Sequence, residues 1–175
     1  MKLEGKVALV TGSSRGVGKA VALGFAASGA DVVINYTSNQ AAADNVVSEI
    51  QSMGRSAVAV KADVAVKSDV ERLVNSAADK FGKLDILVNN AGFTRPAMMV
   101  KMSEDQWDQV ADIHLKGAFM CSQAAGKLMK EQNSGKIINV TSVAGIVGTV
   151  GQINYSAAKG GIISMTKSIA REMAR

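Results

Sequence analysis

The sequence predicts an α/β protein built on a doubly wound parallel sheet. Short apolar runs alternate along the chain with longer segments that have the periodicity of amphipathic helices. The short runs are apolar at successive positions, which is typical of strands buried on both faces of a parallel sheet. Glycines follow three of the helical segments, at Gly29, Gly54 and Gly82, where a helix must stop and the chain must turn back. Right-handed crossovers between such strands produce the doubly wound arrangement.

Five strands and five helices are expected in alternation. The strand segments are KVALVT (6–11), DVVINY (31–36), SAVAVK (56–61), LDILVN (84–89) and KIINVT (136–141). The helical segments cover about 16–28, 40–53, 68–81 and 104–131, and the last runs from about 154 to the end. A chain of 175 residues suffices for one domain with a sizeable core. We therefore expect residues 1–175 to form a single domain.

The composition is that of an ordinary globular protein, with 47% apolar and 20% charged residues. Cys121 is the single cysteine, so no disulfide can form within the chain, and a reducing compartment, the cytoplasm, is expected. No apolar run reaches the length of a membrane span, and the apolar run near the start is too short for a signal peptide. The sequence therefore predicts no membrane partner.

The turn between the first strand and the first helix has the pattern of a phosphate-binding loop. It reads Thr11-Gly12-Ser13-Ser14-Arg15-Gly16-Val17-Gly18. Gly12 permits a tight turn, Gly16 lets the backbone approach a pyrophosphate, and Gly18 lets the helix pack close to the sheet. The helix start offers unpaired N–H groups to the phosphates. Glycines also occur in such turns for steric reasons alone, but this context favours a Rossmann-type dinucleotide site.

The residues after the second strand favour NADP(H) over NAD(H). An acidic side chain there would bind the adenosine ribose of NAD and repel a 2′-phosphate. The segment reads Asn35-Tyr36-Thr37-Ser38, without an acid. Arg15 can face the phosphate instead, with Thr37 and Ser38 as hydroxyl donors.

The net charge of +5 comes from 20 Lys and Arg against 15 Asp and Glu. It is either an ordinary solvated surface or an attraction for an anionic ligand, such as a dinucleotide phosphate or an acyl-carrier substrate. The basic residues are scattered, and one Trp, two Tyr and four Phe offer few stacking surfaces. We therefore expect no nucleic-acid partner.

Tyr155 and Lys159 are four residues apart on the last predicted helix, so their side chains are neighbours on one face. A tyrosine hydroxyl normally titrates near pH 10, and a nearby ammonium and an oxidised nicotinamide ring both favour its phenolate. Such a tyrosine can protonate a carbonyl oxygen as hydride arrives. Ser142, just beyond the fifth strand, can hold the same oxygen. The same spacing also occurs on ordinary exposed helix faces, so the pair alone is weak.

Several motifs in order resemble the classical short-chain dehydrogenase/reductase family, and the resemblance covers the whole chain. They are TGSSRGVG, Asp63-Val64, Asn89-Asn90-Ala91-Gly92, Ser142 and Tyr155-Ser-Ala-Ala-Lys159. The resemblance implies a single NAD(P)-binding Rossmann domain without a metal ion. Its implied cofactor residues are Gly12, Ser13, Ser14, Arg15, Gly16, Val17, Gly18, Thr37, Asp63, Val64, Asn90, Ala91, Gly92, Tyr155 and Lys159.

Among these residues, the resemblance implies that Asp63 and Val64 meet the adenine, although Asp63 can also simply cap a turn. Ser142, Gln152 and Tyr155 are the implied substrate contacts. Tyr155 is the implied proton donor, and Lys159 would grip the nicotinamide ribose while tuning Tyr155.

Within the family, the stretches KLEGKVALVTGSSRGVG and INVTSVAGIVGTVGQINYSAAKGG resemble the 3-oxoacyl-[acyl-carrier-protein] reductase subgroup. That resemblance implies an NADPH-dependent oxidoreductase of fatty acid biosynthesis, which reduces a 3-oxoacyl thioester to the 3-hydroxyacyl product. Related enzymes act on acyl-CoA, sugars or small ketones. Two other classes stay open: a dinucleotide-binding module without turnover, and an interaction protein that assembles through its last two helices.

The sequence departs from the family pattern at His114, where the family usually has an asparagine that helps to hold a water linked to the lysine. His114 can hold the same water, relay protons near neutral pH, or be an interior histidine with its hydrogen bonds satisfied. We include it among the candidate catalytic residues.

A second departure is the end of the chain at Arg175. Members of the resembled family continue through a sixth strand, a substrate-covering helical segment and a seventh strand. We therefore predict that the sequence is a fragment, or the recorded part, of a longer protein, which mass spectrometry showing a native stop at Arg175 would contradict. Without a sixth strand, the 136–141 segment would be an open apolar edge.

The last two predicted helices are apolar on more than one side, including Trp107, Phe119, Ile162 and Met173. Helices of this kind are usually covered twice, once by the sheet and once by another body. A second subunit is the simplest cover, and we expect a homo-oligomer, specifically a homotetramer.

Overall fold

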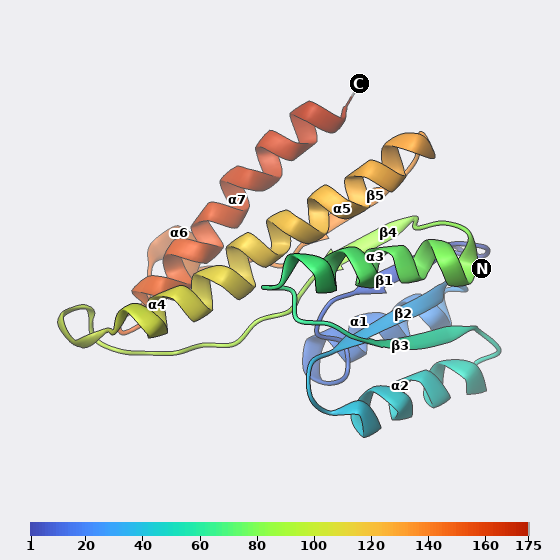
Figure 1. The fold of residues 1–175 in the computed structure, drawn as a ribbon, viewed down its shortest axis with the longest axis horizontal. Helices are drawn as coiled ribbons and strands as arrows, with labels where there is room; N and C mark the ends of the chain where they lie inside the picture. Colours follow the sequence, from blue (N-terminus) through green and yellow to red (C-terminus); the bar gives the residue numbers. More distant parts are fainter. Residues whose placement is uncertain (175) are drawn as a thin grey trace.

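The computed structural model describes residues 1–174 and confirms the predicted Rossmann-type α/β fold (Figure 1). Its five strands are all parallel and form one sheet in the order β3-β2-β1-β4-β5. The strands are β1 (Val7–Val10), β2 (Asp31–Tyr36), β3 (Ala57–Lys61), β4 (Ile86–Asn89) and β5 (Lys136–Asn139). The strand order reverses between β1 and β4, and the carboxyl ends on either side of such a reversal form a crevice suited to ligands.

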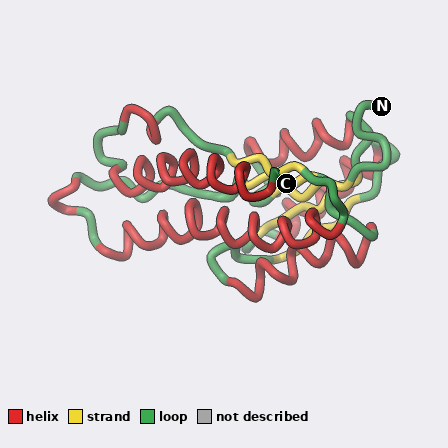
Figure 2. Tube along the Cα trace, turned by 90° about the horizontal axis from the view of Figure 1, so that it is seen from above, coloured by secondary structure: helices red, strands yellow, loops and turns green. Residues whose placement is uncertain are grey.

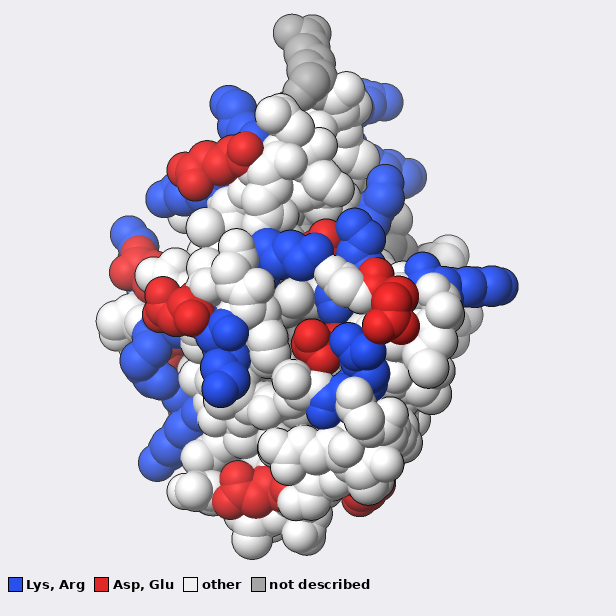
Figure 3. Space-filling model, turned by 90° about the vertical axis from the view of Figure 1, so that its right-hand side faces the viewer, with Lys and Arg blue, Asp and Glu red and all other residues white. Residues whose placement is uncertain are grey.

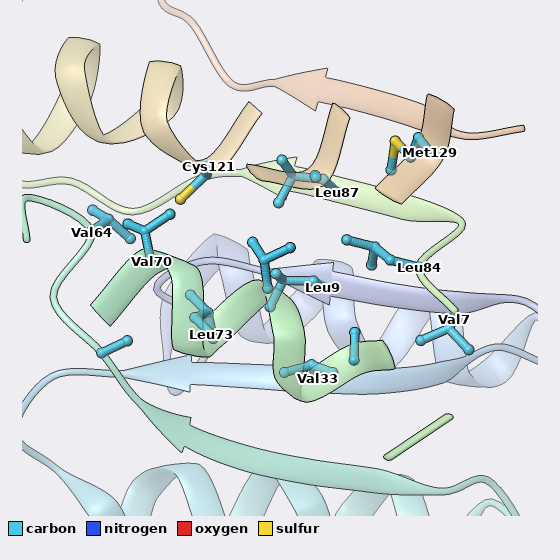
Figure 4. Close-up of a cluster of buried hydrophobic side chains, with 14 residues drawn as sticks. Val7, Leu9, Val33, Val64, Val70, Leu73, Leu84, Leu87, Cys121 and Met129 are labelled. Carbon is cyan, nitrogen blue, oxygen red and sulfur yellow. The ribbon is translucent and has the colours of Figure 1, made fainter. Parts of the chain in front are cut away.

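Helices cover both faces of the sheet, and in Figure 2 the strands lie between helices above and below them. Alternate residues of β1 divide between two buried clusters. Val7 and Leu9 pack with residues of α3 (Lys67–Phe81) and α5 (Gly117–Glu131), as Figure 4 shows for the first cluster. Ala8 and Val10 pack on the opposite face with residues of α1 (Gly16–Ala27) and α2 (Gln40–Ser52). This alternation explains why the strands read as continuous apolar runs.

The long helix expected over 104–131 is not uniform. It consists of α4 (Glu104–Ala111), a π-helical turn η2 (Asp112–Lys116) and α5. Gly117 follows the π-turn, and a Cβ atom there would lie 2.9 Å from a methyl group of Val64. The wider turn and the missing side chain therefore let this helix approach the segment after β3. The apolar pattern continues through the turn, which is why it was not predicted.

The last helix, α7 (Ile153–Met173), begins one residue before the predicted start. It packs against α4, η2 and α5, and Figure 1 shows it lying alongside them. Two short helical segments were not expected: η1 (Met99–Lys101) and α6 (Ala144–Val147). Both lie in loops that follow strands on the carboxyl side of the sheet.

Four further expectations concern the open edge at 136–141, the single cysteine, the scattered charges and the absence of a membrane span. Within the described chain β5 pairs only with β4, and its Ile138 is 45% exposed, so the fifth strand is an apolar edge. Cys121 is a buried free thiol, and the cytoplasmic location stays a prediction. Basic side chains are interspersed with acidic ones on the face in Figure 3 rather than gathered in a block. No helix in residues 1–174 combines the length and hydropathy needed to cross a membrane.

Candidate active site

Thr11 joins the carboxyl ends of β1 and β4. Its backbone N–H donates to the Val88 carbonyl at 3.0 Å. Its hydroxyl accepts from the backbone N–H of Asn90 at 2.9 Å and of Ala91 at 3.0 Å. The Asn90 side chain donates back to the Thr11 carbonyl at 2.9 Å. The glycine turn and the Asn90–Gly92 turn are therefore held together as one edge of a cleft.

The glycines of the first turn have the steric roles expected from the sequence. Gly12 and Gly16 have φ of +63° and +57°, which disfavour any other residue. A Cβ atom on Gly18 would lie 2.5 Å from the Gly12 carbonyl oxygen, whereas one on Gly16 would meet nothing within 4 Å. The first turn of α1 also has no side-chain cap in the structure. This opening and the uncapped helix start fit an anionic pyrophosphate.

Two serines of this turn differ in their surroundings. Ser13 is fully buried, and its hydroxyl donates to the Val10 carbonyl at 2.6 Å. Ser14 is half-buried, whereas Arg15 and Val17 are exposed at the start of α1. Ser13 therefore supports the turn from inside, and the neighbouring residues border the open side.

Asn35 is a supporting residue that the sequence reasoning missed. Its side-chain oxygen accepts from the Gly12 N–H at 2.9 Å, and its amide donates to the Ala62 carbonyl at 3.0 Å. Asn35 is 1% exposed, so this amide braces the ends of β1, β2 and β3 from within. The available signal was a polar amide inside an otherwise apolar strand, where asparagine is disfavoured. Thr37 and Ser38, just beyond β2, are exposed.

Asp63 and Val64 follow β3 on the same side of the sheet. The Asp63 carboxylate accepts from the Ala65 N–H at 2.9 Å, and its own N–H donates to Asp69 at 2.8 Å. Asp63 therefore does cap a turn, which is the alternative that the sequence left open. Val64 is 4% exposed and lies against Gly117. Contact with an adenine ring stays a prediction for both residues.

Lys159 is a buried cation beside Tyr155. Its side chain is enclosed, with 4% of the residue exposed, and its Nζ donates to the Val140 carbonyl at 2.6 Å. The same Nζ lies 5.6 Å from the centre of the half-buried Tyr155 ring. Burial lowers the pKa of Lys159 to about 8. The structure thus brings the two residues together inside a cleft and not on an exposed helix face.

Ser142 is held against α7 by close backbone packing. A Cβ atom on Gly145 would lie 2.6 Å from the Gly160 nitrogen, so the Ser142–Gly145 segment crosses α7 almost in contact. The Thr141 hydroxyl also donates to the Lys159 carbonyl at 2.9 Å. The Ser142 hydroxyl accepts from the Ala144 N–H at 3.2 Å, which leaves its proton free to be donated. Gln152 is half-buried at the start of α7.

His114 enters the site from the π-turn. It is 5% exposed, and its ring meets the Tyr155 ring edge to face, with centroids 5.1 Å apart and planes at 85°. Burial lowers the pKa of His114 from 6.5 to about 4; the hydrogen bond with the Phe93 backbone opposes this shift, and the Lys159 charge adds to it. His114 is therefore neutral near pH 7. A cavity of about 10 Å³, lined by His114, Lys159 and Asn89 among others, lies beside it.

Asn154 is a second supporting residue that was missed. It is 1% exposed, and its amide donates to the carbonyls of Arg95 at 3.1 Å and Gln106 at 2.8 Å. These bonds fix the first turn of α7, which carries Tyr155, to the loop after Gly92 and to α4. Nothing in the local sequence indicates partners so far along the chain.

The residues from three strand ends therefore meet in one cleft. His114 contacts both Gly92 and Tyr155, and the ammonium of Lys159 lies near the Tyr155 ring. Ser142 lies on the segment packed against Lys159. Thr37 forms no hydrogen bond with the glycine turn within residues 1–174, and Asp63 bonds only to its own loop and to α3. The arrangement places a phenol beside a buried ammonium, and this ammonium lines a small cavity together with Thr11 at the start of the glycine turn.

Known proteins match the chain in sequence along nearly its whole length. A family model described as short chain dehydrogenase matches residues 6–175. The 3-oxoacyl-[acyl-carrier-protein] reductase of Synechocystis sp. is 52% identical over 172 residues, which cover 98% of this chain and 70% of that protein. The reductase of the same name from Staphylococcus aureus is 47% identical over 169 residues, covering 97% and 69%.

Solved structures match the fold equally closely. A putative short-chain alcohol dehydrogenase from Sinorhizobium meliloti superimposes with a TM-score of 0.95 at 38% identity, covering 99% of this chain and 68% of the other. A short chain dehydrogenase from Mycobacterium avium has a TM-score of 0.95 at 42% identity, covering 100% and 65%. The chain thus spans about two thirds of the length of these relatives.

Proposed function

This chain belongs to the short-chain dehydrogenase family, and we propose that it reduces a 3-oxoacyl thioester to the 3-hydroxyacyl product with NADPH, using Tyr155 as proton donor. One observation carries the proposal: the buried ammonium of Lys159 lies 5.6 Å from the Tyr155 ring, and Lys159 lines one cavity with Thr11, the first residue of the glycine turn. The reductases of Synechocystis and S. aureus, named for 3-oxoacyl-[acyl-carrier-protein], support the substrate class.

Each residue of the cleft has a task in this reaction. The bound dinucleotide supplies the hydride that reaches the keto carbon. Tyr155 gives its hydroxyl proton to the carbonyl oxygen, so that the C=O bond becomes CH–OH. Lys159 favours the resulting phenolate by its positive charge and is placed to bind the nicotinamide ribose. Ser142 can donate its free hydroxyl proton to the same carbonyl oxygen and hold the substrate in place.

The first test of this function uses the purified chain with NADPH and acetoacetyl thioesters, either on coenzyme A or on acyl carrier protein. We expect loss of NADPH absorbance at 340 nm and an equal amount of 3-hydroxybutyryl product. A chain that binds NADPH but consumes none with any acetoacetyl thioester would contradict the proposal and favour a binding module. Turnover of only sugars or small ketones would reassign the substrate class.

The cofactor preference rests on charge at the edge of the glycine turn. Arg15 is exposed next to the uncapped start of α1, and the buried Asn35 amide is fully engaged with the backbone. No acid follows β2 before Gln40. We therefore propose NADP(H) as the preferred cofactor, with Arg15 and the hydroxyls after β2 facing the 2′-phosphate.

Replacing Arg15 by alanine should raise KM for NADPH about tenfold, the loss of roughly 1.4 kcal/mol expected for an exposed charge-assisted contact. KM for NADH should stay at the wild-type value. Steady-state kinetics with both cofactors measure the two effects. Lys101→Ala, which removes one exposed positive charge far from the turn, is the matched control. An equal increase in KM for both cofactors would contradict a phosphate-specific role.

We also propose that the chain assembles as a homo-oligomer, with a homotetramer as the expected form. Trp107, Phe119 and Met173 on the last two long helices are 40%, 46% and 43% exposed. Phe119→Glu should lower the mass measured by light scattering after size exclusion while the circular dichroism spectrum is unchanged. An unchanged mass, with or without NADPH, would contradict assembly through α5.

A further inference from the structure

The ring of His114 occupies a position that only a glycine opposite can accommodate. A Cβ atom on Gly92 would lie 1.9 Å from the His114 Cε1 atom and 2.6 Å from its Nε2 atom. The imidazole is therefore pressed directly against the backbone of the turn after β4. The π-turn η2 makes this approach possible, because it adds one residue to the helix and pushes His114 inward.

The hydrogen bonds of the ring determine its tautomer. The Nε2 atom lies 2.7 Å from the Phe93 carbonyl oxygen and 3.2 Å from the Phe93 backbone nitrogen. The Phe93 N–H has the geometry to donate to Nε2 at 3.2 Å, but the carbonyl oxygen is closer, and an unprotonated nitrogen at 2.7 Å from it would bring two lone pairs together. We therefore assign the proton to Nε2, which donates it to this carbonyl. The Nδ1 atom is buried and has no partner among residues 1–174. His114 is thus a neutral donor to the turn.

The same ring also contacts Tyr155. The two rings meet edge to face at 5.1 Å, which is a favourable aromatic geometry. Tyr155 is only half-buried, and no side-chain hydrogen bond of its hydroxyl is present in the described residues. The imidazole is therefore one group that can restrict the Tyr155 ring.

We propose that His114 is a positioning residue for Tyr155: its neutral imidazole tethers the Tyr155 ring to the Gly92–Phe93 turn through the Nε2–H bond to the Phe93 carbonyl. The tether places the phenol relative to the turn that borders the cofactor cleft. A displacement of about 1 Å at a reacting group can cost on the order of 100-fold in rate. The inference rests on the proposed function, because it assigns His114 to the proton transfer from Tyr155.

Two substitutions separate the tether from other roles. His114→Gln places an amide nitrogen the same number of bonds from Cα as Nε2, so it keeps a donor to Phe93 and a flat group against Tyr155. Unlike an imidazole, the glutamine amide cannot take up a proton and therefore cannot relay one. His114→Phe keeps an aromatic ring of similar size but loses the donor. Val110→Ala, a fully buried residue one turn earlier in the same helix, is the matched control for a loss of packing alone.

We expect His114→Phe to lower kcat by about tenfold or more with KM for the dinucleotide unchanged, and His114→Gln to keep nearly the wild-type kcat. Val110→Ala should lower the thermal midpoint without changing kcat. Equal losses in the Gln and Phe variants would overturn the tether and favour a proton relay. Full activity in His114→Phe would also overturn it, because packing alone would then explain the residue.

A second measurement does not depend on any substrate. The chain has two tyrosines, so a Tyr36→Phe background leaves Tyr155 as the single source of tyrosine ring signals in an NMR spectrum. The tether predicts one narrow set of ring signals with His or Gln at position 114, and broadened or doubled signals with Phe. Narrow signals in all three proteins would overturn the tether. Absence of turnover in every protein, with the predicted NMR pattern, would instead contradict the proposed function alone.

Discussion

Replacing Tyr155 by phenylalanine is expected to lower kcat for NADPH-dependent reduction by about 10²–10⁴-fold, the usual contribution of a general acid. The substitution removes one hydroxyl group and leaves the ring. The edge-to-face contact with His114 and the packing beside Lys159 should therefore persist. Since the phosphate-binding turn lies on a different element, affinity for NADPH should change much less than kcat.

Two measurements test this result together. Steady-state rates with an acetoacetyl thioester give the loss in kcat, and a titration followed by NADPH fluorescence gives the affinity. Ser156→Ala is a matched control, since it removes a hydroxyl from the next residue of α7, whose oxygen has no partner in the described chain. Equal kcat for the Tyr155→Phe and wild-type proteins would exclude Tyr155 as the proton donor.

The fold could be predicted because its signals are local. The apolar runs and helix-terminating glycines lie in the segments that form β1 to β5 and their connecting helices. The differences occur where a residue bonds far along the chain. The predicted strand 84–89 begins at Ile86 in the structure, although the Asp85 backbone already bonds to both neighbours: its N–H donates to the Val7 carbonyl and its carbonyl accepts from the Lys136 N–H, both at 2.9 Å. The strand predicted to end at 141 ends at Asn139, because Val140 and Thr141 bond to Lys159.

The candidate site was predictable in its residue types but not in its supports. Tyr155, Lys159 and the glycine turn are identified by an ordered set of motifs. Asn35 and Asn154 act through side-chain bonds to backbone carbonyls 27 and 59 residues away, respectively, and no local pattern predicts such partners. His114 is recognisable in the sequence as a departure from the family pattern. Its neutral state, however, depends on its burial in a π-turn, which the apolar periodicity does not predict.

Replacing Lys159 by methionine is expected to abolish most turnover and yet to stabilise the fold at pH 7. Lys159 is 4% exposed, and within residues 1–174 its ammonium donates a single hydrogen bond, to a neutral carbonyl, and pairs with no carboxylate. Burial lowers the pKa of Lys159 from 10.5 to about 8. This difference corresponds to about 3 kcal/mol of unfavourable burial of the charge. Methionine has an unbranched side chain one atom shorter than that of lysine, and it removes the charge.

The pH dependence follows from the direction of the shift. Below about pH 8 both the folded and the unfolded wild-type chains carry the proton, so the full cost of the buried charge is present. Between pH 8 and 10.5 the folded chain has lost this proton while the unfolded chain retains it. The Lys159 contribution to the free energy of unfolding therefore rises with pH over this window. The methionine variant should lack this rise.

Urea unfolding at pH 7 and pH 10 measures both effects. Loss of the bond to Val140 offsets about 1–2 kcal/mol, so Lys159→Met should gain about 1–2 kcal/mol at pH 7. At pH 10 most of the cost of the charge has gone, so the variant should be less stable than wild type by up to about 1 kcal/mol. Lys167→Met, at an exposed lysine two turns along α7, should change the free energy of unfolding by less than about 0.5 kcal/mol. A Lys159→Met protein less stable than wild type at pH 7 would show that the lysine stabilises the fold. A stabilised but inactive variant would instead show that the buried charge of Lys159 lowers the stability of the fold and is needed for turnover. This result is expected of a residue that acts on Tyr155.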